Sequence, residues 1–66
     1  MSIGNQIMSI RRERQLTQEQ FGSLFHVTRQ TVSNWENGKS YPDLQLLVGI
    51  SDQFGISLDT LLKEDT

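Results

Sequence analysis

Several residue types are scarce in this 66-residue sequence, and each scarcity excludes a class of structure. The chain has no cysteine, one proline, one tryptophan and a single histidine, His26. Without cysteine no disulfide or thiolate metal site can form, and one imidazole excludes most histidine-based metal sites. No apolar run approaches the ~20 residues of a membrane span, and the N-terminus lacks the basic-then-apolar pattern of a signal peptide. We therefore expect a soluble, cytoplasmic domain without a metal or cofactor.

The charge is unevenly distributed along the chain. The formal net charge is -2 and the pI is about 5.1. Residues 1–41 contain five basic and three acidic side chains, a balance of +2, whereas residues 42–66 contain one basic and five acidic side chains, a balance of -4. A positive surface suits a phosphate-bearing partner, and an acidic surface would face away from it. The sequence therefore predicts a polarised domain despite its acidic total.

Residues 17–38 predict two short helices separated by a tight break. Thr17 followed by Gln20 is a capping-box signature, and it opens a helix in which Phe21, Leu24 and Phe25 fall on one face. Glycine in the middle of a helix costs ~1 kcal/mol relative to alanine, so Gly22 indicates a close approach of the following helix.

The second helix of this pair follows a turn at His26-Val27. Thr28 can cap it, Val32 and Trp35 recur three apart on an inward face, and Gly38 supplies the left-handed residue that ends it. The outward face then carries Arg29, Gln30, Ser33 and Asn34. Arginine can read guanine, glutamine or asparagine can read adenine, and serine can serve several bases. A plainly solvated polar face is the alternative interpretation.

One helix is expected before this pair. Ser2 can cap it, and Ile3, Ile7 and Ile10 repeat at the spacing of a buried stripe up to about Arg14. We expect Arg14, like Arg12, on a solvated face.

Two helices are expected after the pair. Asp43 can cap a fourth helix that Gly55 ends, and Ser57 can cap a short fifth helix. The residues expected to face the core are Leu44, Leu47, Ile50, Ser51 and Phe54 of the fourth helix, and the fifth helix contains Leu58, Leu61 and Leu62. Residues 1–66 therefore predict one all-α domain of five helices, with a modest core that takes only ~60% of the chain's surface out of water.

The central residues resemble a known family. They are Gln18 with Phe21-Gly22, then Val27-Thr28-Arg29-Gln30-Thr31-Val32-Ser33, then Trp35-Glu36-Asn37-Gly38-Lys39 and Pro42. This spacing resembles the helix-turn-helix of phage-repressor-like transcription regulators, the Cro/CI or xenobiotic-response-element family. The resemblance implies a compact lambda-repressor-like fold, with the helix-turn-helix at about residues 17–38 and the third helix in the major groove. His26 departs from the glycine that the family usually has in the turn, where a positive φ favours glycine.

The resemblance also implies roles for individual residues. Arg11 is expected to pair with Glu36, tying the first helix to the end of the third; phosphate contact is the alternative for Arg11. Thr28 is expected at phosphate, and Gln18 at phosphate, at a base, or only at the helix cap. The full set of expected DNA-binding residues is Thr17, Gln18, Thr28, Arg29, Gln30, Ser33, Asn34, Asn37, Lys39 and Tyr41.

The C-terminal half has more apolar residues than one small core readily hides. Leu46, Val48, Ile56 and Leu58 suggest a second buried surface. The resemblance implies that two copies meet through this region on a two-fold operator, and packing at the edge of the core is the alternative.

These patterns lead to one principal functional hypothesis. We expect a sequence-specific regulator of double-stranded DNA, a repressor acting as a homodimer on a palindromic operator, or the DNA-binding domain of a longer chain. The alternative is an antitoxin-like or regulatory protein-interaction module with secondary DNA binding. An enzyme is not expected, because the acidic residues are dispersed, Ser33 has no nearby histidine partner, and no glycine-rich phosphate loop is present.

Overall fold

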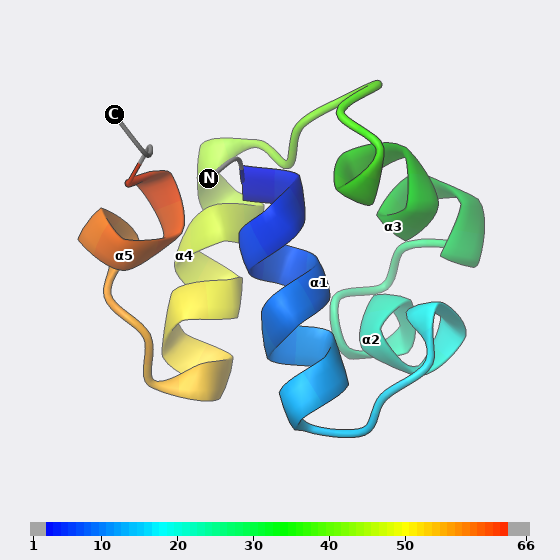
Figure 1. Ribbon diagram of the computed structural model, residues 1–66, viewed down its shortest axis with the longest axis horizontal. Helices are drawn as coiled ribbons and strands as arrows, with labels where there is room; N and C mark the ends of the chain where they lie inside the picture. Colours follow the sequence, from blue (N-terminus) through cyan, green and yellow to red (C-terminus); the bar gives the residue numbers. More distant parts are fainter. Residues whose placement is uncertain (1–2, 64–66) are drawn as a thin grey trace.

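The computed structural model describes residues 3–63, and in this part of the chain all regular structure is helical. The helices are α1 (Ile3–Glu13), α2 (Gln18–Leu24), α3 (Arg29–Glu36), α4 (Leu44–Phe54) and α5 (Leu58–Leu62). Helix α1 lies in the middle, with α2 and α3 on one side and α4 and α5 on the other (Figure 1). The predicted five-helix, all-α fold is confirmed. The predicted cap of α1, Ser2, lies outside the described residues.

Four helices begin at the capping residues that the sequence predicts. The side-chain oxygens of Thr17, Thr28, Asp43 and Ser57 each accept a hydrogen bond from the backbone N–H three residues later. At α2 the capping box is complete, because the Thr17 N–H also donates to Oε1 of Gln20 at 2.9 Å. Each cap satisfies a backbone donor that has no partner inside its helix, which fixes where α2 to α5 begin.

Each of the helices α1 to α4 is followed closely by one residue in the left-handed conformation. These residues are Gln15 (φ 58°), His26 (φ 59°), Gly38 (φ 75°) and Gly55 (φ 65°). The N–H of the following residue donates back to the carbonyl five positions earlier, as in Leu16 N to Arg11 O (2.9 Å) and Lys39 N to Asn34 O (2.9 Å). This is the Schellman pattern. Both glycine stops are confirmed, His26 has the positive φ expected of the turn, and Gln15 was not anticipated.

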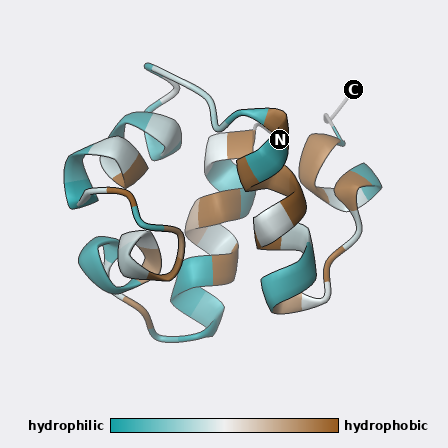
Figure 2. Cartoon of the chain, turned by 180° about the vertical axis from the view of Figure 1, so that it is seen from behind, coloured by the Kyte–Doolittle hydropathy of each residue, from teal (hydrophilic) through white to brown (hydrophobic). Residues whose placement is uncertain are grey.

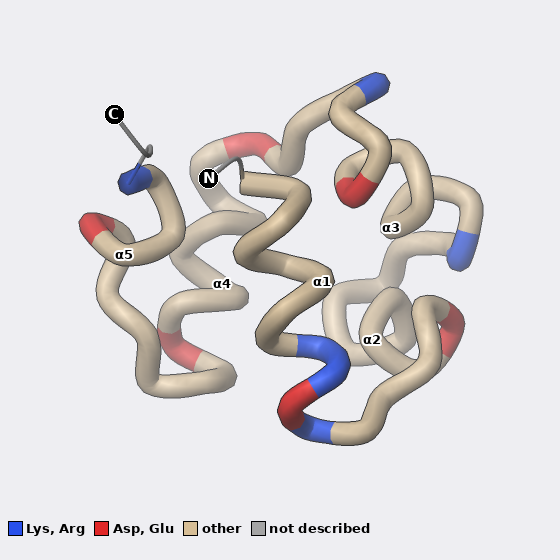
Figure 3. Tube along the Cα trace, in the orientation of Figure 1, with Lys and Arg blue, Asp and Glu red and all other residues tan. Residues whose placement is uncertain are grey.

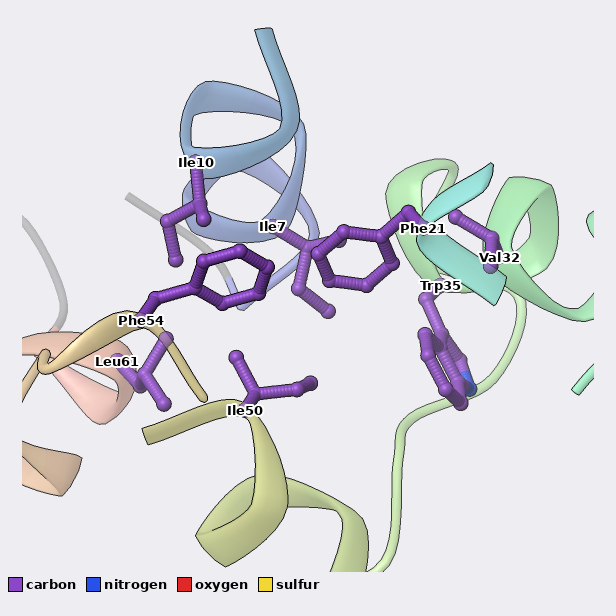
Figure 4. Close-up of a cluster of buried hydrophobic side chains, with 8 residues drawn as sticks. All are labelled: Ile7, Ile10, Phe21, Val32, Trp35, Ile50, Phe54 and Leu61. Atoms are coloured by element: carbon purple, nitrogen blue, oxygen red, sulfur yellow. The ribbon is translucent and has the colours of Figure 1, made fainter. Parts of the chain in front are cut away.

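The core lies where α1 meets the other helices (Figure 4). Its buried members are Ile7, Ile10, Phe21, Val32, Trp35, Ile50, Phe54 and Leu61. The rings of Phe21 and Phe54 stack with centroids 5.6 Å apart, so α2 also packs against the end of α4. The inward faces predicted for α1 and α3 are therefore correct, and they leave the opposite side of α3 in contact with solvent.

Three leucines at helix ends are exposed, and one of them, Leu44, was expected to face the core. Leu24 is 43% exposed, Leu44 69% and Leu62 47%. Each is the first or last residue of its helix. Helical spacing assigned Leu44 to the core, but this first residue of α4 is largely exposed, so that assignment was wrong.

Two glycines allow close contact between backbones. A Cβ added at Gly22 would lie 2.7 Å from the carbonyl oxygen of Val27, and one added at Gly4 would lie 2.3 Å from that of Trp35. Gly22 therefore brings α2 against the turn that leads into α3, and Gly4 brings α1 against the end of α3. Together they fix the position of α3 relative to the rest of the domain.

Candidate nucleic-acid interface

The solvent side of α3 is a polar surface on a rigid support. Arg29 and Gln30 are exposed and Ser33 and Asn34 are half-buried, whereas Val32 on the inner side is fully buried. The hydropathy colouring agrees, with less hydrophobic colour on α2 and α3 than on α4 and α5 (Figure 2). The structure thus has the outward face predicted from the sequence, mounted on a helix that the core holds in place.

Side chains on this face are hydrogen-bonded to one another. Nε2 of Gln30 donates to Oδ1 of Asn34 at 3.1 Å, and Nδ2 of Asn37 donates to Oγ of Ser33 at 3.4 Å. Both pairs are four residues apart, the spacing at which helical side chains are neighbours. The polar groups of α3 are therefore partly ordered before any ligand arrives. The sequence spacing permits these bonds, but it does not identify which donor is used.

The carboxylate of Glu36 joins three helices behind this face. Nε of Arg11 donates to its Oε2 at 2.7 Å and Nη2 of Arg11 to its Oε1 at 3.0 Å, so the expected Arg11–Glu36 pair is present. Nε2 of Gln18 also donates to Oε1, at 3.1 Å. Arg11 Nη1 donates to the carbonyl of Leu16 at 3.0 Å. The network links the end of α1, the start of α2 and the end of α3.

The pairing of Glu36 with Arg11 explains how a carboxylate can be buried in this network. Glu36 is only 8% exposed, which is rare for a carboxylate unless it is paired. Hydrogen bonding to Glu36 raises the pKa of Arg11 above its ordinary value, so Arg11 stays charged. Gln18, expected to contact DNA or help cap α2, uses one amide N–H to hold Glu36 and keeps its carbonyl oxygen and second N–H available.

The loop after α3 lies beside the same surface. Asn37, Lys39 and Tyr41 are exposed, and Pro42 is buried and anchors the end of the loop. Arg29 is the first residue of α3 and Lys39 lies in the loop that follows the helix, so basic residues stand at both ends of α3, where Figure 3 shows blue segments. The expected DNA-binding residues therefore come together along α3, its two ends and the start of α2.

Arg14 lies elsewhere and has a different role from the one predicted. It is exposed, as expected, but its Nη2 donates to the carbonyl of Phe54 at 3.3 Å and its guanidinium lies 5.2 Å from the centre of the Phe54 ring. The side chain thus fastens α1 to the C-terminal end of α4. The two residues are far apart in the sequence, and no local pattern indicates this contact.

The residues expected at a dimer interface have different environments. Leu46, Ile56 and Leu58 are half-buried and pack against the core, whereas Val48 is 40% exposed. Other exposed apolar residues of α4, α5 and the preceding loop are Tyr41, Leu44 and Leu62. Asp52 on α4 and Asp59 on α5 are exposed acidic residues, and Figure 3 shows acidic positions on both helices. Within residues 3–63 no helix is both long and apolar enough to cross a membrane.

Comparisons with known proteins agree with this geometry. A profile of the family described as "Helix-turn-helix" matches residues 7–61. The chain is 37% identical over 63 residues to the HTH-type transcriptional activator BcrR of Enterococcus faecalis, covering 96% of this chain and 31% of that protein. It is 30% identical over 66 residues to the immunity repressor protein of Bacillus phage phi105, covering 100% of this chain and 46% of that protein. The chain thus spans less than half the length of these curated relatives.

A solved structure has nearly the same fold. The crystal structure of the P22 c2 repressor protein in complex with synthetic operator 9T matches with a TM-score of 0.87 and 28% identity, covering 98% of each chain. This fold and this family are those of DNA-binding transcription regulators and not of enzymes. The capping signals, the turn at His26 and the polar face of α3 all lie within the matched residues. The chain therefore belongs to the helix-turn-helix family of phage-repressor-like transcription regulators.

Proposed function

We propose that this chain binds double-stranded DNA sequence-specifically by placing α3 in the major groove. The observation that carries the proposal is the outward face of α3, where polar side chains stand on a helix whose other side is locked into the core. A major groove about 12 Å wide admits an α-helix and presents a distinct pattern of donors and acceptors for each base pair. The similarity to a repressor crystallised with its operator supports this orientation.

The residues of the interface divide into two groups in this proposal. Arg29, Gln30, Ser33 and Asn34 read base edges, with guanine the natural partner of Arg29 and adenine that of Gln30. The other group contacts the sugar-phosphate backbone and fixes register without reading sequence. Its members are Thr17, Gln18, Thr28, Asn37, Lys39 and Tyr41.

We propose further that two copies bind a palindromic operator. The domain measures 30 × 24 × 22 Å, and half-sites one helical turn apart are separated by ~34 Å, so two bound copies would lie side by side. Val48, proposed for the contact together with Leu46, Ile56 and Leu58, is exposed, and so are Leu44 and Leu62 beside them. These side chains supply the apolar surface that neighbouring copies would share.

The regulatory outcome follows from where such a complex forms. A protein that occupies the major groove within a promoter excludes other proteins from the same bases, and for this reason we propose that the chain is a repressor. We propose that it acts in the cytoplasm. One of the relatives reported above is a repressor and the other an activator, so the sign of regulation is tested separately by transcription from a promoter that carries the operator.

A gel-shift titration with a preferred duplex and a scrambled duplex tests the binding mode. Gln30→Ala should retain the helical content of the unaltered chain, as measured by circular dichroism, and lose preference for the adenine-containing position. Gln53→Ala is the matched control, because Gln53 is an exposed glutamine on α4 that lies outside the interface. A Gln30→Ala variant with unchanged affinity and unchanged base preference would refute the assigned reading face.

A further inference from the structure

One residue of the proposed DNA surface, Gln18, has its side chain tied to the buried network of Glu36. Gln18 is the half-buried first residue of α2, where the capping box of Thr17 fixes the backbone. Its Nε2 donates to Oε1 of Glu36 at 3.1 Å, and Glu36 is the last residue of α3. The Gln18 side chain is therefore held at both of its ends.

The bond from Gln18 to Glu36 can form with the amide in one orientation only. Glu36 also accepts two bonds from the Arg11 guanidinium, at 2.7 and 3.0 Å. The carboxylate of such an ion pair accepts hydrogen bonds and donates none. The carbonyl oxygen of Gln18 cannot replace its nitrogen at this place, because two acceptors would then face each other. Glu36 therefore fixes which end of the amide turns inward.

This orientation leaves a donor for DNA. A glutamine nitrogen carries two N–H groups, and Glu36 accepts from one of them. The two N–H bonds of a planar amide diverge, so the second points away from the Glu36 oxygen. Glutamine is among the side chains that bind phosphate oxygens, which need a donor. The inward bond thus orders the amide of Gln18 while its second N–H stays available.

Ordering this side chain before DNA arrives has a measurable effect on affinity. A glutamine that moves freely in solvent loses rotamer freedom when it binds a phosphate. Immobilising one such side chain at an interface weakens binding by roughly two- to tenfold. Gln18 loses this freedom when the domain folds, and so the loss does not weaken its contact with DNA.

We propose that Glu36 is a positioning residue that holds the Gln18 amide ready to donate to a DNA phosphate. The inference rests on the proposed binding of DNA, and it gives the buried carboxylate a role at the contact surface in addition to its role in stability. Gln18 makes the contact, and Glu36 orients it. Lys39 lies in the exposed loop after α3, and its proposed phosphate contact provides a comparison.

The test replaces single phosphates of a preferred duplex, obtained by selection, with neutral methylphosphonates. For each position, fluorescence anisotropy gives the ratio of the affinities for the natural and the substituted duplex. The phosphate contacted by Gln18 is the position at which Gln18→Ala lowers this ratio most, and Lys39→Ala identifies the phosphate contacted by Lys39. Partial unfolding reduces both affinities by the same factor, so the ratio does not depend on stability.

Two variants separate positioning from stability. Glu36→Ala releases the amide of Gln18, so the ratio at the Gln18 phosphate should fall roughly two- to tenfold while the ratio at the Lys39 phosphate persists. Ile50→Val is the control, because Ile50 is fully buried on α4 and its truncation weakens the core; both ratios should persist. Binding is measured well below the Tm of Glu36→Ala, where circular dichroism shows that the variant is folded.

A measurement on the unaltered chain tests the bond without any loss of stability. The two protons on Nε2 of Gln18 give separate NMR signals, which are assigned by their absence in Gln18→Ala. The proton bonded to Glu36 should exchange with water more slowly than the amide protons of Gln53, an exposed glutamine on α4. Equal exchange at Gln18 and Gln53 would overturn the positioning role, even if Glu36→Ala does not fold.

The outcomes distinguish this inference from the proposal beneath it. An unaltered chain that selects no duplex would overturn the proposed function and the inference together. A chain that selects a sequence would overturn only the positioning role if Gln18→Ala lowers no ratio, or if the ratio at the Gln18 phosphate survives Glu36→Ala. An equal fall at the Gln18 and Lys39 phosphates in Glu36→Ala would also overturn it, because the carboxylate would then act on the domain as a whole.

Discussion

Replacing Glu36 with alanine removes the acceptor that joins α1, α2 and α3. Its carboxylate receives two hydrogen bonds from Arg11 and one from Gln18, and its side chain is 2% exposed. Removing one partner of a buried pair costs about 3–5 kcal/mol, because the other charge stays desolvated without a counter-ion. The Arg11 side chain is 14% exposed and keeps its bond to the Leu16 carbonyl. We therefore expect the free energy of unfolding to fall by about 3 kcal/mol, the lower end of this range.

That loss is large for a chain of 66 residues. Stabilities of about 0.05–0.15 kcal/mol per residue correspond here to roughly 3–10 kcal/mol. A change of 1 kcal/mol moves the Tm of a domain of this size by about 4–8 °C, so Glu36→Ala should lower the Tm by roughly 12–24 °C. Thermal and urea unfolding, followed by circular dichroism, measure the change in Tm and in the free energy of unfolding.

Two further variants test whether the loss of stability depends on the buried position of Glu36 and on its charge. Asp52→Ala removes an exposed carboxylate from α4 and should alter the free energy of unfolding by no more than about 0.5 kcal/mol. Glu36→Gln retains one acceptor oxygen but loses the charge, and should lie between Glu36→Ala and the unaltered chain. A Glu36→Ala variant within about 1 kcal/mol of the unaltered chain would refute the reasoning, because the pair would then not hold the helices together.

Three other predictions concern the turn, the helix contact and the DNA surface. His26→Gly should raise the free energy of unfolding by up to about 1 kcal/mol, because a φ of 59° strains a residue with a Cβ; destabilisation in urea would contradict this. Gly22→Ala should destabilise by about 1–3 kcal/mol despite alanine's helix propensity, because its Cβ would meet the Val27 carbonyl; a higher Tm would count against it. DNA affinity should depend only weakly on salt, since few basic residues flank α3, and a slope equivalent to about ten neutralised phosphates would be inconsistent.

Helix boundaries were predictable from the sequence because they depend on neighbouring residues. Thr17, Thr28 and Asp43 cap the N–H groups three positions later, and Gly38 and Gly55 supply the left-handed stops. Gln15 has the same left-handed conformation as Gly55, but glutamine gives no signal for it in the sequence. The end of a helix could therefore be predicted from this sequence mainly where the left-handed residue is glycine.

Contacts between distant residues were predictable only through the family resemblance, or not at all. The pair between Arg11 and Glu36 was expected only from the family resemblance of the surrounding residues. Nothing local indicates that Arg14 contacts Phe54, or that Gln18 donates to Glu36. Helical spacing also assigned Leu44 to the core, although it is exposed as the first residue of α4.

The sequence predicted which face of α3 is exposed to solvent, but it did not predict the hydrogen bonds between side chains on that face. Periodicity places Val32 and Trp35 inside and therefore Gln30 outside, which the structure bears out. The direction of the bond between Gln30 and Asn34 depends on side-chain torsions that no sequence pattern encodes. The arrangement of donors and acceptors on this face could therefore not be predicted from the sequence.

Selection of bound sequences from a randomised duplex library tests the central claim most directly. If α3 of two copies reads DNA, the bound pool should converge on a palindromic consensus whose half-sites lie about one helical turn apart, ~34 Å. The Gln30→Ala variant should select a pool that has lost one position of that consensus in each half-site. A pool that shows no enrichment over the starting library would contradict the account.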